Sequence, residues 1–235
     1  MSSSKKRIVI TGSKGYIGQH LVKMLSLYPD KYEVIEFVGD VTDPMAFETG
    51  HTVVHLAAHV RVNESVKKPY KYYYNNINGT FNVANRFVYE NFIFASSATA
   101  SNPVNPYAIS KRACEDIIKT KCVEKEANYT IFRFYNVTGS DGFAPTNPDG
   151  LLYNLMQAEK TLEFNVFGND YNTKDGTCLR DYIHVNEVCE SIIKAIEKPA
   201  NNIENLGSGN GFTVEDMIDA YKQVNKVDFT VNYLP

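Results

Sequence analysis

Tyr107 and Lys111 are the two side chains in this sequence best suited to moving a proton. They stand four residues apart in the segment Tyr107-Ala-Ile-Ser-Lys111, which opens a predicted helix directly after Pro106. Residues at positions i and i+4 of a helix share one face, so the ammonium group should lie beside the phenol. A nearby positive charge stabilises the phenolate and lowers its pKa from about 10. We therefore predict a general base that works near neutral pH.

Ser97 is the third candidate catalytic residue, because Ser96-Ser97 ends the predicted strand that precedes this helix. Ligands of parallel sheets bind at the carboxyl ends of the strands, where a serine hydroxyl can hydrogen-bond a reacting oxygen. The spacing Tyr-x-x-x-Lys by itself is common on exposed helices. The serine at the strand end and the nucleotide-binding motif upstream favour the catalytic interpretation.

That upstream motif is Gly12-x-x-Gly15-x-x-Gly18, which follows a predicted strand and opens a predicted helix. Glycines let the backbone turn sharply and approach a pyrophosphate, while the helix N-terminus supplies free N–H groups and the positive end of the helix dipole. A glycine-rich turn without a ligand is the alternative. The strand–turn–helix context favours dinucleotide binding.

Two acids follow where the adenosine half of a dinucleotide would lie. Glu36 stands at the end of the second predicted strand, where an acid hydrogen-bonds the ribose, and Asp40 can reach the adenine edge. Solvated loop acids are the alternative for either residue alone. No arginine lies near them to receive a 2′-phosphate, which favours NAD over NADP.

The elements that must position these residues alternate between short strands and longer helices. Strands are expected at 7–11, 32–38, 52–56, 91–95 and 129–134, and helices at 16–27, 75–90 and 106–126. This rhythm is typical of βαβ units, so we predict an α/β fold with a doubly wound, Rossmann-like parallel sheet. We expect residues 1–135 to form an NAD-binding domain and residues 136–235 a smaller C-terminal lobe interleaved with it. The irregular segment 136–150 between them should be functional.

Composition excludes several classes of protein. The chain has 235 residues, a net charge of −3 and 43% apolar residues, so it is an ordinary globular chain with no excess positive field for nucleic acid. No apolar run is long enough to cross a membrane. The four cysteines form no Cys-x-x-Cys pair, so we expect reduced thiols in the cytoplasm and no metal site.

The motifs together resemble the extended short-chain dehydrogenase/reductases, and within them the UDP-glucose 4-epimerase branch. The resemblance rests on Thr11–Gly18, Val54–Ala58, Asn75–Thr80, Phe94–Thr99, Tyr107-x-x-x-Lys111, Phe132–Asn136 and Phe167–Val185. It covers nearly the whole chain. It implies an NAD-dependent epimerase that interconverts UDP-glucose and UDP-galactose at C4 through a transient 4-keto sugar, with the C-terminal lobe binding the UDP-sugar.

The resemblance also implies roles for individual residues. Ser97, Tyr107 and Lys111 would be the catalytic set. The residues that would line NAD are Gly12, Gly15, Tyr16, Ile17, Gly18, Glu36, Asp40, Leu56, Ala57, Ala58, Asn76, Tyr107, Lys111 and Tyr135. The residues that would hold the UDP-sugar are Ser97, Asn136, Asn154, Asn165, Val166, Phe167 and Arg180.

Two segments of this chain are shorter than in the family, and two alternative functions stay open. The stretch from Ser97 to Tyr107 and the part after Val224 are shorter than in the family, so we expect a more open hexose half of the site. A dehydratase or reductase of the same fold is less favoured, because those dehydratases carry Thr-Asp-Glu where this chain has Ser97-Ala-Thr99. A non-catalytic homologue that only binds NAD or a sugar nucleotide is the further alternative, and the sequence leaves open whether the protein forms a homodimer.

Overall fold

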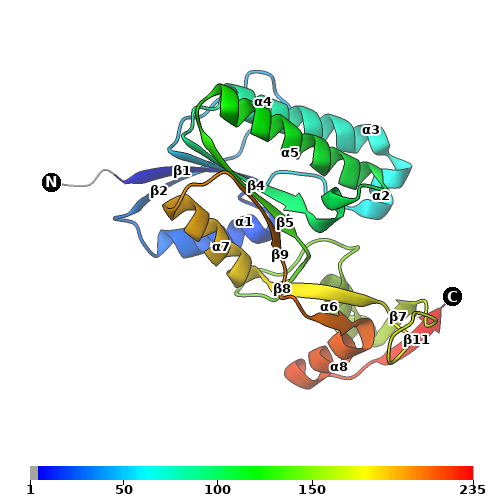
Figure 1. Cartoon of the computed structure of the whole chain (residues 1–235). Coiled ribbons are helices and arrows are strands. Elements are labelled where there is room, and N and C mark those ends of the chain that lie inside the picture. Colours follow the sequence, from blue (N-terminus) through cyan, green and yellow to red (C-terminus); the bar gives the residue numbers. More distant parts are fainter. Residues whose placement is uncertain (1–4, 235) are drawn as a thin grey trace.

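Five strands from the first 135 residues and one from the second half of the chain form one parallel sheet (Figure 1). The structure is a computed structural model that describes residues 5–234. In spatial order, the strands are β2 (Tyr32–Phe37), β1 (Lys6–Thr11), β3 (Thr52–His55), β4 (Asn91–Ser97), β5 (Asn128–Phe134) and β9 (Asn202–Leu206). The order reverses next to β1, as expected of a doubly wound sheet. The predicted fold class is therefore confirmed.

Helices cover both faces of this sheet (Figure 1). The helices α1 (Tyr16–Ser26) and α7 (Val185–Glu197) pack together on one face. The other face carries α4 (Gly79–Arg86) and α5 (Pro106–Glu124), with α2 (Val62–Lys67), α3 (Pro69–Tyr72) and the π-helix η1 (Tyr73–Asn78) next to α5. A 3₁₀ turn, η2 (Ala98–Ser101), connects β4 to the loop before α5.

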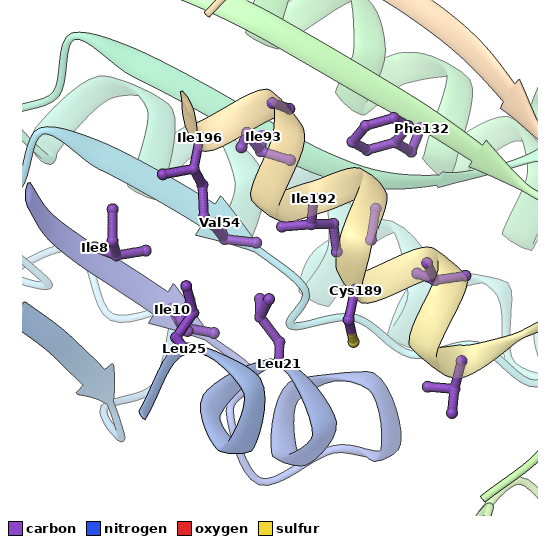
Figure 2. Packing of buried hydrophobic residues seen from close by; sticks show 14 of the residues in the cluster. Ile8, Ile10, Leu21, Leu25, Val54, Ile93, Phe132, Cys189, Ile192 and Ile196 are labelled. Carbon is purple, nitrogen blue, oxygen red and sulfur yellow. The ribbon is translucent and has the colours of Figure 1, made fainter. Parts of the chain in front are cut away.

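The strands bury both of their faces because apolar side chains point alternately to the two helix layers. On β1, Ile8 and Ile10 pack with Leu21 and Ile192 under α1 and α7, as Figure 2 shows. Val9, between them, packs in the cluster on the opposite face. Burial on both sides is typical of a parallel sheet, and it fixes the register in which the strand ends meet.

The C-terminal lobe has smaller sheets and a core of its own. One sheet consists of β10 (Gly211–Thr213), β8 (Leu179–His184) and β6 (Asn136–Thr138), and a second consists of β11 (Thr230–Leu234) and β7 (Glu163–Phe167). The helices α6 (Leu151–Thr161) and α8 (Val214–Asn225) pack there around buried Leu155, Phe164, Ile218 and Phe229. Between these elements the chain returns to the main sheet to add α7 and β9 (Figure 1).

The single helix predicted at 75–90 is wrong in detail. The chain is helical from Pro69 to Arg86, but it runs through α3, the π-helical turn η1 and α4. A π-helical turn carries one extra residue per turn and often occurs at functional sites. Here it turns the side chain of Asn76 inward, where it is 2% exposed.

Candidate active site

The turn between β1 and α1 brings the backbone close to its neighbours. Gly12 has a φ of +71°, which favours glycine, and a Cβ there would lie 2.7 Å from the backbone nitrogen of Ala57. A Cβ on Gly18 would collide with the carbonyl oxygen of Gly12. No side chain caps α1 at Gly15, so the first turn of the helix offers backbone N–H groups to an anion.

A cavity of about 300 Å³ lies beside this turn. Its lining residues are Gly12, Ser13, Lys14, Gly15, Phe37, Val38, Gly39, Asp40, Val41 and Ala57. They come from the carboxyl ends of β1, β2 and β3, where a doubly wound sheet binds nucleotides. The buried hydroxyl of Ser13 has no hydrogen-bond partner among the described residues, so it can bond a polar group that enters the cavity. The cavity therefore fits the adenosine and pyrophosphate of a dinucleotide.

Glu36 and Asp40, the acids predicted to bind the ribose and the adenine, make different hydrogen bonds. Lys14 Nζ donates to Glu36 Oε2 at 2.7 Å, and this hydrogen bond lowers the pKa of the Glu36 carboxyl below its usual value. Asp40 lines the cavity, and its Oδ1 accepts from the backbone nitrogen and the hydroxyl of Thr42, both at 2.8 Å. The sequence analysis missed Lys14, although its place directly before Gly15 was a signal of proximity to phosphate.

The residues predicted to line NAD after β3 lie at the same sheet edge. The backbone nitrogens of Leu56 and Ala57 donate to the backbone oxygen and the hydroxyl of Thr11, at 3.1 and 3.3 Å. Ala57 lines the cavity, and Ala58 follows it in the loop. Tyr135, 42% exposed, follows β5.

Asn76 connects this edge to α5. Its Nδ2 donates to the backbone oxygen of His59 and to Ser110 Oγ, each at 3.0 Å, and its Oδ1 accepts from the backbone nitrogen of His59 at 2.8 Å. Ser110 lies on α5 between Tyr107 and Lys111. The buried amide therefore fixes the loop after β3 against the helix that carries the candidate base.

Tyr16 and Ile17, also predicted to line NAD, pack against the α1–α7 side of the core. The hydroxyl of Tyr16 donates to the backbone oxygen of Gly139 at 2.5 Å. This hydrogen bond ties the first turn of α1 to the irregular segment 136–150, which the sequence analysis did not foresee.

The candidate catalytic residues come together where β4 ends and α5 begins. Asn105 caps α5 by accepting from the backbone nitrogen of Ala108 at 2.9 Å, and Pro106 takes the first helical position. Tyr107 and Lys111 therefore lie in the first two turns. Lys111 is 3% exposed, and its Nζ donates to the backbone oxygen of Ala95 at 2.6 Å. It also lies over the ring of Phe94, 4.7 Å from the centroid.

Ser97 is 9% exposed and ends β4. Its Oγ lies 2.8 Å from Thr99 Oγ1 and accepts from the backbone nitrogen of Thr99 at 3.3 Å. Burial is the largest influence on the pKa of Tyr107 and raises it, whereas the nearby Ser97 hydroxyl lowers it. Ser97 and Tyr107 are therefore neighbours at this strand end.

The electrostatics of this pair correct one expectation from the sequence. Burial raises the pKa of Tyr107 to about 12, and burial lowers the pKa of Lys111 to about 8. Both shifts favour the uncharged form, as desolvation does. We expected the ammonium to lower the pKa of the phenol, but Lys111 Nζ donates to the strand backbone in this structure, and desolvation is the larger effect.

A second cavity, of about 540 Å³, lies in the C-terminal lobe. Its lining residues are Asn63, Pro148, Asp149, Leu151, Asn154, Gln157, Ala158, Thr161, Glu163, Phe164, Asn165, Val166, Phe167 and Val214. Four of the residues predicted to hold the UDP-sugar, Asn154, Asn165, Val166 and Phe167, therefore share one cavity. The other three do not line it. Ser97 ends β4 in the main sheet, Asn136 Nδ2 donates to the backbone oxygen of Asp181 at 2.8 Å, and Arg180 lies exposed on β8.

An ion pair connects the loop after β3 to the wall of this second cavity. Arg61 Nη2, from the loop after β3, lies 3.2 Å from Asp149 Oδ1 at the cavity wall. It joins the loop beside the dinucleotide cavity to the segment before α6.

Comparison with known proteins identifies the family. Residues 8–207 match the model of the NAD dependent epimerase/dehydratase family. The chain belongs to this family. It is 31% identical over 280 residues to UDP-glucose 4-epimerase of Haemophilus influenzae, an alignment that covers 94% of this chain and 83% of the relative. The same enzyme of Dictyostelium discoideum is 32% identical over 279 residues, covering 93% and 81%.

Solved structures agree with this assignment. UDP-glucose 4-epimerase from Brucella ovis in complex with NAD superimposes with a TM-score of 0.84 at 26% identity, over 97% of this chain and 85% of that chain. NAD is the cofactor of the epimerase/dehydratase family, and the uncapped helix start, the buried Ser13 hydroxyl and the cavity beside them fit it.

The described residues contain neither a membrane-spanning helix nor a cluster of metal ligands. Among residues 5–234, no helix combines the length and the apolar character that crossing a membrane would need. Within the same range, no group of three or more His, Cys, Asp or Glu side chains is arranged to hold a metal ion.

Proposed function

We propose that this member of the epimerase/dehydratase family is an NAD-dependent UDP-hexose 4-epimerase, which interconverts UDP-glucose and UDP-galactose. The observation that carries the proposal is the arrangement of Ser97, Tyr107 and Lys111 at one strand end, next to a cavity that fits NAD. The similarity to curated epimerases over 94% of the chain supports the same reaction.

NAD, when bound, supplies the acceptor for the C4 hydride of the sugar and returns that hydride to the opposite face. The residues of the chain handle the proton and hold the substrate. Tyr107 Oη takes the proton of the 4′-hydroxyl and later gives it back, so that the net reaction is an isomerisation. Ser97 Oγ hydrogen-bonds the same sugar oxygen and orients it toward the phenol.

Lys111 makes this proton transfer feasible. Burial raises the pKa of Tyr107 to about 12, so a phenolate at this position needs a compensating positive charge. The Lys111 ammonium, one helical turn away, is that charge. The pKa of Lys111 is about 8 because of burial, so the ammonium predominates at neutral pH and is lost above this value. Turnover should therefore decline as pH rises through about 8.

We assign the UDP moiety to the cavity of the C-terminal lobe. Asn154 and Asn165 offer amide donors and acceptors to a base, and Phe167 offers an exposed aromatic side chain. Asn136 and Arg180 complete the proposed set from β6 and β8. In this division residues 1–135 bind NAD and residues 136–235 bind the UDP-sugar, with α7 and β9 returning to the first part.

The test is product analysis after incubation of the purified protein with UDP-galactose. We expect UDP-glucose to accumulate without net formation of NADH and without loss of water from the sugar. Tyr107→Phe should keep NAD and UDP binding and lose about 10²- to 10⁴-fold in turnover, because the only assigned acid/base group is removed. A dehydrated product would identify the dehydratase alternative, and binding without turnover would identify the non-catalytic one.

Location and assembly belong to the same proposal. The four cysteines are free, and Cys114, Cys122 and Cys189 are buried. Free thiols are typical of a reducing compartment, which supports the cytoplasm. A homodimer stays a prediction, and light scattering of the eluted protein would test it.

A further inference from the structure

The most buried ion pair of the described residues lies behind the candidate catalytic residues and has no role in the mechanism so far. It joins Glu115 on α5 to Arg133 on β5, whose side chains are 0% and 15% exposed. Every other ion pair in residues 5–234 has a carboxylate at least 19% exposed. A carboxylate without solvent must be paired and fully hydrogen-bonded, or it destabilises the fold.

Glu115 meets this requirement with three hydrogen bonds. Its Oε1 accepts from Ser96 Oγ at 2.5 Å and from Arg133 Nε at 2.9 Å, and its Oε2 accepts from Arg133 Nη2 at 2.6 Å. The guanidinium is therefore bidentate, the geometry that fixes direction as well as distance. Its remaining Nη1 donates to Ser101 Oγ at 3.1 Å.

The residues of β4 and η2 that make these contacts lie on both sides of Ser97 in the sequence. Ser96 precedes it on β4, and Ser101 ends the 3₁₀ turn η2 that follows it. Ser96 is also the register partner of Arg133 in the pairing of β4 with β5. The ion pair thus holds the strand on one side of the reactive serine and the turn on its other side.

The same carboxylate belongs to the helix that carries the proposed base. Tyr107, Lys111 and Glu115 follow one another at four-residue spacing on α5, so all three face the end of β4. Lys111 Nζ donates to the backbone oxygen of Ala95, and Glu115 accepts from the side chain of Ser96. Neighbouring residues of β4 are therefore anchored to successive turns of α5.

We propose that Glu115, paired with Arg133, is a positioning residue of the reaction, which sets the distance between Ser97 and Tyr107 and keeps a negative charge behind Lys111. The inference rests on the proposed function. Proton transfer needs its partners within hydrogen-bond reach, and a displacement of about 1 Å can cost about 10²-fold in rate. The charge has a second effect. Burial is the largest influence on the pKa of Lys111 and lowers it, whereas Cys114 and then Glu115 raise it. Cys114 on α5 and His55 on β3 are the other titratable groups that face Lys111, and burial favours the uncharged form of both.

The decisive variant is Glu115→Gln, which keeps the shape and an acceptor for Ser96 but removes the charge. We expect kcat for UDP-galactose to fall about 10- to 100-fold, while KM and bound NAD per protein stay within about twofold, because no substrate contact is lost. The high-pH limb of the kcat profile, which reports loss of the Lys111 ammonium, should move to lower pH by about one pH unit.

Two further variants separate position from charge. Ser96→Ala removes one hydrogen bond and leaves the carboxylate, so kcat should fall without a shift of the pH profile. Arg133→Lys keeps the positive charge but loses the bidentate fork, and it should also lower kcat. If Glu115→Gln fails to fold, these two variants still test the positioning role through kcat at constant KM.

The matched control is Glu197→Gln on α7. This carboxylate is also paired, with Lys6 and Lys31 at 3.3 and 3.0 Å, but it lies away from Ser97. It should change neither kcat nor the pH profile. Wild-type kcat and profile in Glu115→Gln would overturn the proposal, as would an equal loss in the Glu197→Gln control.

A readout without turnover distinguishes this inference from the proposed function. The Lys111 side chain can be titrated by NMR in isotope-labelled protein and assigned with Lys111→Met. A lower Lys111 pKa in Glu115→Gln supports the electrostatic role even if the wild type shows no epimerase activity, whereas an unchanged pKa refutes that role.

Discussion

At the scale of single residues, Glu36 and Lys14 form the contact that bears on the choice of cofactor. Lys14 Nζ lies 2.7 Å from Glu36 Oε2, at the edge of the dinucleotide cavity that Lys14 helps to line. We predict that Glu36→Ser weakens NAD binding about tenfold, because the acceptor for the ribose hydroxyl is lost. It should bind NADP better than the wild type does, since the freed ammonium meets the 2′-phosphate. Calorimetric titration of both cofactors measures the two affinities, and Glu33→Ser, farther back on β2, is the control. Unchanged preference in Glu36→Ser would contradict the prediction.

His55 shows what burial does to a group that takes no part in the reaction. Its Nδ1 lies 2.6 Å from Thr11 Oγ1 and its Nε2 lies 3.0 Å from Thr80 Oγ1. Burial first, and then the charge of Lys111, lower the pKa of His55 from 6.5 to about 3. These contacts show that His55 is a core histidine whose two ring nitrogens both have hydrogen-bond partners.

The depressed pKa of His55 makes stability depend on pH. Between about pH 6.5 and pH 3, the unfolded chain binds a proton at His55 and the folded chain does not. The contribution of His55 to the free energy of unfolding is therefore fully present above pH 6.5 and is lost as the pH falls. The free energy of unfolding should decrease by about 2 kcal/mol between pH 7 and pH 5 from this residue alone. Urea titrations at the two pH values measure it. In His55→Gln the decrease should be smaller by that amount, and an identical decrease in the variant would show that other groups are responsible.

At the scale of elements, the sequence predicted best where a local rule determines the structure. The apolar run Ile8-Val9-Ile10 and the glycines after it were sufficient to predict β1, the turn and α1. Pro106 marked the start of α5, and the structure adds the Asn105 cap and ends the helix at Glu124, two residues earlier than predicted. The π-helical turn around Asn76 could not be predicted, because its extra residue depends on contacts with the distant His59 and Ser110.

Contacts between elements were also beyond the sequence for a physical reason. Glu115 and Arg133 were not singled out, since a pairing between a helix and a strand follows from the register of β4 with β5 and not from spacing along the chain. The residues expected to bind NAD and UDP-sugar stay predictions as binding residues. Their placement near two cavities could be expected only in part, because Asn136 and Arg180 line neither of them.

The contact between α1 and segment 136–150 gives a prediction at this scale. Tyr16 donates to the backbone of Gly139, and His20, one turn later, accepts from the backbone nitrogen of Asp141 at 3.1 Å. The helix that would hold the pyrophosphate of NAD therefore also holds the segment that leads to the second cavity.

We predict that Tyr16→Phe loosens this segment and lowers UDP affinity several-fold, while NAD affinity changes little, because the removed hydroxyl faces Gly139. Fluorescence titration with UDP, on protein saturated with NAD, measures the effect. Tyr28→Phe, at the exposed end beyond α1, serves as the control. A loss of NAD affinity equal to that of UDP would mean that Tyr16 acts on the cofactor site instead.

At the scale of the whole molecule, the cores differ in size. The sheet is covered by large apolar clusters on both faces, whereas the C-terminal core consists of six buried residues between α6, α8, β7 and β11. Small cores open with less free energy than large ones. The part that lines the second cavity is thus expected to exchange its amide hydrogens faster than β4, whose residues are all buried.

Substitution of Phe229, in the C-terminal core, tests this expectation. Its ring is 5% exposed and packs with Phe164 at 6.1 Å and Tyr221 at 6.5 Å between ring centroids. Phe229→Ala should destabilise the C-terminal core by about 3–5 kcal/mol, which is comparable to the stability that such a small core provides. Phe164, Asn165 and Val166, which line the cavity, belong to the strand that this core supports.

We therefore predict that Phe229→Ala loses UDP binding while it still binds NAD, because the glycine turn lies in the other part of the molecule. Hydrogen exchange should rise in residues 151–167 and 214–234 and stay low in β4. Ile192→Ala is the matched control, since Ile192 is buried in the main core under α7. That variant should lower the stability of the whole molecule without a selective loss of UDP binding. If Phe229→Ala instead lost NAD and UDP binding together, the two parts would unfold as one cooperative unit, and the independent C-terminal core would be refuted.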